Sequence, residues 1–467
     1  MGWKYGGLKR EMLQSRGLLL TIFAASIGGT FQYGFNLTII NAPTTYIQKF
    51  INETWTKHYG TQLESGVITL LWSITVATYF VGGLVGALIA GPMAITCGRR
   101  NSLLLSNIFV LVGALLMGLS RTAESFEMII IGRFFSGINS GVGININPMY
   151  LGECAPKKIR GLVALSFAPF TAAGLVVGQT IGLREILGSE ELWPLLLASC
   201  AVPALIQLIT LPWCPESPRY LLIDRENKDL CIKELCKSCP APVTVSSTCF
   251  FPNPFTVDLE PSKRGYPTGT SEEDTIIQTT SRAGIPNEKI QYATIGTGCS
   301  EFITALTSNL FVERIGRRML LLGGYSSMVV CGILFTISLT LQDKITWMPF
   351  LSMACIFASI LSFGIGPAGV TGIIPMEIFD QTARPAAYMI NGSLFWITLI
   401  IVGMTFPFIV GGLGSFCYVP FLSFSFLAAL FIGFFLPETK GKTFLEISHE
   451  FYERNFKGQP EQAETRL

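Results

Sequence analysis

The stretch Glu313-Arg314-Ile315-Gly316-Arg317-Arg318 closes a long apolar run, and its last three residues repeat Gly98-Arg99-Arg100, which closes another. Two further motifs of the first half return in the second half, again about 220 residues later. Three dissimilar motifs that recur at nearly one separation indicate a duplicated structural unit. The other recurrences are Glu153 with Arg160, which returns as Glu377 with Arg384, and Pro215-Glu216, which returns as Pro437-Glu438.

Composition indicates the solvent in which the chain folds. Hydrophobic residues make up 50% of the 467 residues and charged residues only 14%, and the mean hydropathy is +0.50. A water-soluble chain of this size could not bury so much apolar surface in one core, so the bilayer is the expected solvent. A helix needs roughly 20 apolar residues to cross it. Eleven such runs are present, at residues 17–40, 67–90, 103–120, 126–150, 162–182, 193–213, 291–312, 319–341, 348–376, 386–411 and 416–436.

The loops between the first six runs differ in charge. Lys and Arg gather in alternate loops, first at Arg99 and Arg100 and next at Lys157 and Lys158. By the positive-inside rule these loops lie in the cytosol, together with both ends of the six spans. Residues 1–16 are basic and precede an apolar run without a small-residue cleavage site, which predicts an uncleaved signal anchor.

The sequon Asn52-Glu53-Thr54 falls in the first loop on the outer side. It predicts N-glycosylation at Asn52, because acceptor asparagines lie in surface loops outside the cytosol. A chance occurrence of this short tripeptide is the alternative.

The repeat predicts the fold class. Two six-span halves in the same orientation are typical of an all-α membrane protein of the major facilitator architecture, with the substrate held between the halves. The counterpart of the first span should lie near residues 240–260, but residues 225–290 are polar and rich in proline. Eleven spans are therefore readable where twelve are expected. The predicted domains are a cytosolic N-terminus (1–16), an N-terminal six-helix bundle (17–213), a cytosolic linker whose proline-rich segment replaces span seven (214–290), a C-terminal bundle with five readable spans (291–436) and a cytosolic tail (437–467).

The missing span creates a conflict of topology. With eleven crossings, the helix at 291–312 would run outward and leave Arg317 and Arg318 outside, whereas parallel repeats require them inside. Residues 240–290 would have to cross the bilayer to restore the parallel arrangement, but they carry charges and prolines. An unusual exon choice or an error in the sequence would also account for the segment.

Charged residues at the cytosolic ends of the spans form a candidate gate. Carboxylate–guanidinium pairs can hold two helical bundles together and separate when the bundles rock apart. Topology signals with solvated ion pairs are the alternative. The candidate gate residues are Arg99, Arg100, Arg133, Glu153, Arg160, Glu313, Arg314, Arg317, Arg318, Glu377 and Arg384.

Glu301 is the clearest ionisable residue at membrane depth. An ionisable group inside a span is a functional candidate by default. The carboxyl could carry a coupling proton, bind a sugar hydroxyl, or make a hydrogen bond between helices. The sequence leaves these three roles open.

Polar and aromatic residues in the spans suit carbohydrate. Sugar hydroxyls need amide and hydroxyl partners, and aromatic rings cover the C–H face of a sugar. Helix packing is the alternative role for each candidate. Besides Glu301, the substrate-binding candidates are Gln32, Tyr33, Asn36, Gln179 and Trp396.

Other function classes find little support. The net charge of +2 is too small to indicate nucleic acid. No Walker motif is present, which argues against ATP-driven transport, and nothing indicates an enzyme or a cofactor. Cys236-Lys-Ser-Cys239 lacks an accompanying histidine and lies among prolines, so no metal site is expected there.

Taken together, these motifs resemble the facilitative hexose transporters of solute carrier family 2, and among them the fructose-type subgroup. The resemblance implies that Gln179, Trp396 and Tyr33 face the sugar and that the protein resides in the plasma membrane. It also implies that Glu301 stands where glucose carriers have an amide. The stretches that carry it are residues 31–36, Gly132-Arg133, residues 148–153, residues 215–219, residues 313–318, residues 384–387 and residues 437–443.

Several positions depart from the family pattern. Where glucose carriers have an aromatic lid and an amide, this chain has Gly372 and Phe395, which implies fructose or altered selectivity. The span-seven motif with its Gln-Gln pair is absent. Residue 36 is an asparagine where proton-coupled relatives carry an aspartate, and this favours uniport. The sequence therefore predicts facilitative hexose transport by alternating access, with a transport-deficient variant or a proton-coupled symporter as alternatives.

Overall fold

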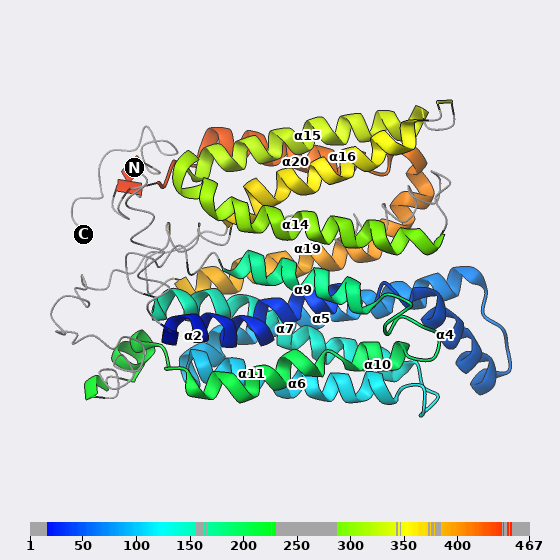
Figure 1. The fold of residues 1–467 in the computed structure, drawn as a ribbon, viewed down its shortest axis with the longest axis horizontal. Coiled ribbons are helices and arrows are strands. Elements are labelled where there is room, and N and C mark those ends of the chain that lie inside the picture. The colour runs from blue at the N-terminus through cyan, green and yellow to red at the C-terminus, as the bar shows by residue number, and fades with distance from the viewer. Residues whose placement is uncertain are drawn as a thin grey trace, which may run out of the picture.

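The computed structural model describes residues 16–155, 163, 166–225, 227–229, 287–341, 344–345, 347–371, 374, 378, 384–440, 442, 446–447 and 449–450. Within them the chain is helical, and the helices run alongside one another in two groups (Figure 1). The N-terminal half supplies one group and the chain after Asn287 supplies most of the other.

The N-terminal half contains six spans and one outer helix. Its first span is continuous through a π-helical turn, and α4 follows this span at the end opposite Arg99. The elements are α2 (Arg16–Ser26), η1 (Ile27–Phe31), α3 (Gln32–Thr38), α4 (Thr44–Tyr59), α5 (Ser65–Thr96), α6 (Arg99–Leu119), α7 (Glu127–Cys154), α9 (Phe167–Ile181), α10 (Trp193–Ala198), α11 (Ala201–Thr210), η2 (Leu211–Trp213) and η3 (Tyr220–Asp224).

The C-terminal half contains five spans among the described residues. Its third span is interrupted by a π-helical turn at Pro367, as expected where proline removes a backbone donor. The elements are α14 (Asn287–Ile315), α15 (Arg317–Leu341), α16 (Met348–Phe363), η4 (Gly364–Ala368), α17 (Gly369–Thr371), α19 (Arg384–Leu413), η5 (Gly414–Phe416) and α20 (Val419–Phe435).

Within the described residues, each of the eleven apolar runs coincides with one helix or with up to three consecutive helical segments. Eight of the described helices are long and apolar enough to cross a membrane, and α9 and α20 are shorter apolar helices. The remaining run lies on α14, whose 29 residues include Glu301. The prediction of an all-α, multi-span protein is confirmed.

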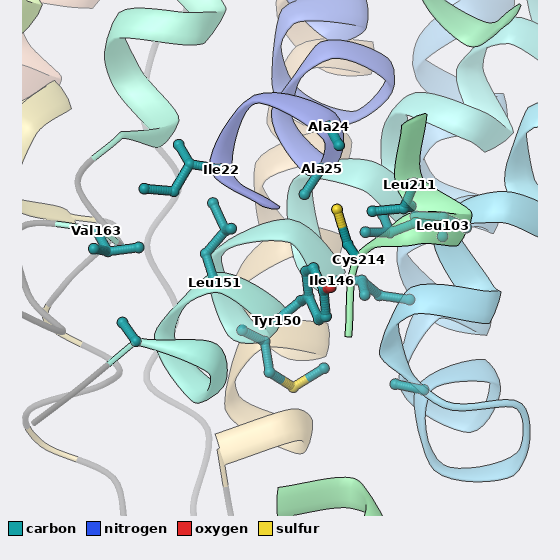
Figure 2. Close-up of a cluster of buried hydrophobic side chains, with 14 of the residues drawn as sticks. Ile22, Ala24, Ala25, Leu103, Ile146, Tyr150, Leu151, Val163, Leu211 and Cys214 are labelled. Atoms are coloured by element: carbon teal, nitrogen blue, oxygen red, sulfur yellow. The ribbon is translucent and has the colours of Figure 1, made fainter. Parts of the chain in front are cut away.

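The N-terminal half is tied together near Arg99 by a buried apolar cluster. Figure 2 shows side chains of α2, α6, α7 and η2 meeting there, among them Ile22, Leu103, Tyr150 and Leu211. The Tyr150 hydroxyl donates a hydrogen bond of 2.5 Å to the carbonyl of Pro215. This cluster fixes the helix ends that carry the charged motifs.

The two halves meet along α5 and α19 and along α9 and α14. On α5 and α19 the pairs are Gly83 with Trp396 and Gly91 with Met389, so the two helices run antiparallel. A Cβ at Gly83 would lie 2.3 Å from the Trp396 ring. Only glycine allows this approach.

The direction of α14 resolves the conflict of topology. At its start the Tyr292 hydroxyl lies 3.4 Å from a Glu185 carboxylate oxygen, in the loop that also contacts Arg121 after α6. A 29-residue helix is about 43 Å long. Its far end, and Arg317 after it, therefore lie at the same end of the molecule as Arg99.

The conclusion that eleven spans place the two Gly-Arg-Arg motifs on opposite faces is thus wrong. The halves are parallel because α14 enters from the outer end rather than from the cytosolic end. Residues 230–286 lie outside the described residues, as do residues 1–15 and the tail from 451.

Candidate functional site

Aromatic side chains fill the centre of the interface between the halves. The Trp396 ring of α19 has an exposed fraction of 0%. Its centroid lies 5.7 Å from that of Tyr33, 5.8 Å from that of Tyr79 and 6.4 Å from that of Phe80. Phe395 joins them, 5.6 Å from Trp396. These five residues are the aromatic cluster, and their edge-to-face or tilted arrangements are those that aromatic rings prefer.

Two of the predicted sugar ligands approach this cluster from α9 and α14. Gln179 packs against Gly298, where a Cβ would lie 2.3 Å from the amide oxygen. Glu301 follows Gly298 by three residues and so shares its helix face. Its carboxyl is half-buried and interacts electrostatically with Tyr33. The structure thus brings Tyr33, Gln179, Glu301 and Trp396 together.

Two buried polar groups next to the cluster have no hydrogen-bond partner within the described chain. They are the side-chain amide of Asn36, with both of its polar atoms, and the indole N–H of Trp396. Both residues have exposed fractions of 0%. A buried polar group without a partner costs about 1–3 kcal/mol. A ligand rich in hydroxyls could supply the missing partners.

Gln32 does not lie with the other candidates. Its side-chain amide donates a hydrogen bond of 2.8 Å to the carbonyl of Cys200, between α10 and α11. Neighbouring residues of a helix project about 100° apart, so Gln32 and Tyr33 cannot both face the same cleft. Gln32 packs inside the N-terminal half.

Arg133 lies at the wrong end for the cytosolic gate. It is two turns from the outer start of α7, and it donates a hydrogen bond of 2.7 Å to the backbone carbonyl of Asn36. Its guanidinium carbon lies 4.3 Å from the centroid of the Tyr79 ring. The prediction is corrected: Arg133 joins span one to the aromatic cluster.

At the cytosolic end of the N-terminal half, Arg99 and Glu153 form the expected ion pair. Arg99 Nε lies 3.0 Å from Glu153 Oε2, and the side chains are 5% and 9% exposed. The Ser217 hydroxyl donates a further hydrogen bond of 2.5 Å to Glu153. Both members belong to the N-terminal half, so this pair joins α6 to α7 and does not join the two halves.

The Gly-Arg-Arg and Pro-Glu motifs are partners in each half. The Arg100 backbone N–H donates to Glu216 at 2.9 Å, and those of Arg317 and Arg318 donate to Glu438 at 2.9 and 3.1 Å. A carboxylate at a helix N-terminus satisfies unpaired N–H groups and complements the helix dipole. The glycine before each helix has φ of 94° or 104°, which other residues rarely adopt.

The roles of Glu216 and Glu438 were not predicted from the sequence, although their spacing repeats with the arginines. Tyr79 and Phe80 were not predicted either, because aromatic residues in an apolar run have the same pattern as ordinary core residues. Several other gate candidates lie outside the residues that the structure describes. Arg160, Glu377 and also Gly372 are not described, nor are the side chains of Glu313, Arg314 and Arg384.

The predicted glycosylation site lies within a helix. Asn52 is on α4, and its side-chain oxygen accepts a hydrogen bond of 3.2 Å from the backbone N–H of Leu63. Thr54 is 4% exposed and donates to the carbonyl of Phe50. The sequon is at the outer end, as predicted, but its threonine is folded against the protein.

No group of His, Cys, Asp or Glu able to hold a metal ion occurs among the described residues. Cys236 and Cys239 lie outside them. The site described above therefore consists of aromatic, amide and carboxyl groups at the interface of two parallel helical halves.

The sequence family described as "Sugar (and other) transporter" matches residues 21–239 and 278–451. The chain belongs to the sugar transporter family. The match leaves out residues 240–277, within the stretch where span seven was expected. The relatives described here belong to solute carrier family 2. Human facilitated glucose transporter member 11 is 52% identical over 96% of this chain and 95% of that protein.

Two further relatives belong to the same family. Human member 9 is 38% identical over 98% of this chain and 89% of that protein, and rat member 5 is 38% identical over 94% and 92%. This chain is accordingly a multi-pass membrane transporter and not an enzyme.

Solved structures support the fold. A proton:xylose symporter, XylE, bound to 6-bromo-6-deoxy-D-glucose matches with a TM-score of 0.73 at 18% identity, over 93% of this chain and 99% of that one. XylE from E. coli in a partially occluded inward-open conformation matches with a TM-score of 0.72 at 20% identity, over 92% and 100%. The major facilitator fold predicted from the repeat is confirmed.

Proposed function

We propose that this chain carries a hexose, fructose or glucose, across the bilayer by facilitated transport, with the sugar held at the aromatic cluster. The observation that supports the proposal most directly is the position of Trp396. Its ring lies between the halves, against Tyr33, with Gln179 and Glu301 close by. Alternating access requires the substrate to touch both halves, and this cluster draws residues from α3, α5 and α19.

Selectivity for fructose over glucose follows from residue 395. The Phe395 ring lies 6.2 Å from that of Tyr33 and offers no hydrogen bond. A pyranose that needs an amide at this position would bury a hydroxyl without a hydrogen-bond partner. This would cost about 1–3 kcal/mol of binding free energy. A substrate that makes fewer polar contacts at this position loses less binding free energy.

Uniport is favoured over symport because Asn36 beside Arg133 cannot titrate. Glu301 remains the one named candidate for a coupling proton. It is half-buried and close enough to Tyr33 to interact with it electrostatically, so a role in binding a sugar hydroxyl fits its position as well.

The experiment is uptake of labelled fructose and glucose by proteoliposomes that contain the purified chain. Fructose uptake is expected to saturate and to fall strongly in Trp396→Ala. Trp347→Ala, at an exposed position before α16, serves as the matched control and should transport normally. If uptake fell equally in both variants, the loss would come from the preparation of the protein and not from the site.

A transport-deficient variant is the second candidate. The observation that favours it is the interrupted family match over residues 240–277. In this case the wild-type chain fails in the uptake assay although it is folded. Sequencing of transcripts across this junction should then reveal a form with an apolar run near a Gln-Gln pair.

Residence in the plasma membrane and glycosylation at Asn52 are also proposed. Surface biotinylation of intact cells tests the first. For the second, the burial of Thr54 requires the glycan to be added before α4 folds. Glycosidase treatment should increase the gel mobility of the wild type but not that of Asn52→Gln.

A further inference from the structure

Arg133 is a buried cation at the outer end of the N-terminal half. Its exposed fraction is 1%. A charge removed from water costs several kcal/mol unless it is paired. Within the described chain no carboxylate forms an ion pair with it, and its Nε is among the buried atoms without a hydrogen-bond partner. Its contacts are the dipole of the Asn36 carbonyl and the face of Tyr79.

A cavity of about 60 Å³ adjoins this guanidinium. This is large enough for an ion or a few waters but far below the roughly 300–1,000 Å³ of small-molecule sites. Its wall mixes apolar side chains with polar ones. The lining residues are Leu37, Ile40, Asn41, Thr44, Trp72, Val76, Phe80 and Arg133.

The polar part of the wall suits an anion. Thr44 is the first residue of the 16-residue helix α4, so the positive end of that helix dipole lies at the cavity. The guanidinium presents several N–H donors, of which one is accepted by Asn36. The cavity shares Phe80 with the aromatic cluster, but Trp396 is not among its lining residues, so it lies beside the proposed sugar site and not at Trp396.

We propose that the cavity beside Arg133 binds a small monovalent inorganic anion, such as chloride, which neutralises the guanidinium at the outer end of span one. The anion would accept hydrogen bonds from Arg133. The Thr44 hydroxyl already donates to the Asn41 carbonyl at 2.7 Å, so Thr44 contributes only through the positive end of the α4 dipole. The bound anion holds Arg133 where it supports both Asn36 and Tyr79. The proposal does not depend on the proposed transport of hexose.

Binding of radioactive chloride to the purified full chain, in a gluconate background of constant ionic strength, tests this proposal. The wild type should bind chloride saturably. Arg133→Gln should lose this binding, and Arg121→Gln, which removes an exposed arginine from the same end, should retain it. Failure of the folded wild type to bind chloride saturably would overturn the proposal.

A second variant guards against misfolding of Arg133→Gln. Asn41→Asp places a carboxylate of nearly the same shape on the cavity wall, which gives Arg133 a fixed counter-ion and should abolish chloride binding. Asn101→Asp, exposed at the other end, is its control. Crystals of the wild type soaked in bromide should show an anomalous peak within hydrogen-bonding distance of Arg133. Retained binding in Asn41→Asp, or a peak only elsewhere, contradicts the assignment.

Discussion

Gly83 offers the sharpest test of how the two halves meet. In the structure an added Cβ at this position would lie 2.3, 2.4 and 2.4 Å from three carbons of the Trp396 ring. Carbon atoms in contact prefer about 3.5–4.0 Å. In Gly83→Ala, therefore, either α19 moves away from α5 by about 1 Å or the Trp396 ring leaves the aromatic cluster.

The loss of stability in Gly83→Ala can be estimated from other overpacked protein interiors. Extra carbon in a filled interior typically destabilises by about 1–3 kcal/mol. Since alanine is better than glycine in a helix by about 1 kcal/mol, part of this cost is offset. The net loss of stability is then small, whereas displacement of Trp396 acts directly on the proposed sugar site. Transport should fall more than stability does.

Thermal unfolding in detergent and fructose uptake into proteoliposomes should be measured on the same preparations. Gly323→Ala is the matched control, because this glycine is within α15 and an added Cβ meets no atom within 4 Å. It should be as stable as the wild type or slightly more so and should transport normally. Undiminished uptake by Gly83→Ala would refute the view that close packing of α5 on Trp396 is required.

Three further substitutions have expected outcomes. Phe395→Asn should shift selectivity toward glucose, because the amide offers a sugar hydroxyl a partner; an unchanged ratio in competition assays would contradict this. Glu301→Gln should leave uptake insensitive to an uncoupler, as in the wild type; if the wild type accumulates sugar against a gradient and the variant does not, Glu301 is the coupling site. Glu438→Gln should lower stability by about 0.5–2 kcal/mol, because its carboxylate accepts from the N–H groups of Arg317 and Arg318; an unchanged unfolding temperature would argue that this cap is dispensable.

The sequence was sufficient for the fold because long apolar runs and a repeat are visible without knowledge of contacts. All eleven runs are helical where the structure describes them, and it places the two Gly-Arg-Arg motifs at one end, as parallel halves require. Counting apolar runs from the N-terminus placed Arg317 and Arg318 at the wrong end, because α14 starts at the outer end of the molecule. The repeat was the stronger signal.

The site was harder to predict. Whether a residue contributes to it depends on the helix face on which the residue lies and on its position along the helix. Gln32 and Tyr33 are adjacent in sequence, yet one binds the carbonyl of Cys200 and the other packs against Trp396. Arg133 follows a glycine, like the cytosolic arginines, but lies at the other end of its helix. No feature of the sequence distinguishes Tyr79 from the aromatic residues of the core.

The contacts within each half differ in kind from those between the halves. The buried ion pair of Arg99 with Glu153, and the hydrogen bond from the Arg318 backbone N–H to the Glu438 carboxylate, each join elements of one half. Between the halves, α5 and α19 instead meet through small residues and aromatic rings, as at Gly83. Buried ion pairs are costly to break, whereas apolar surfaces can slide with little change in buried area. We therefore expect the charged motifs to keep each half rigid during alternating access, while the conformational equilibrium is set at the aromatic cluster, where the substrate would bind.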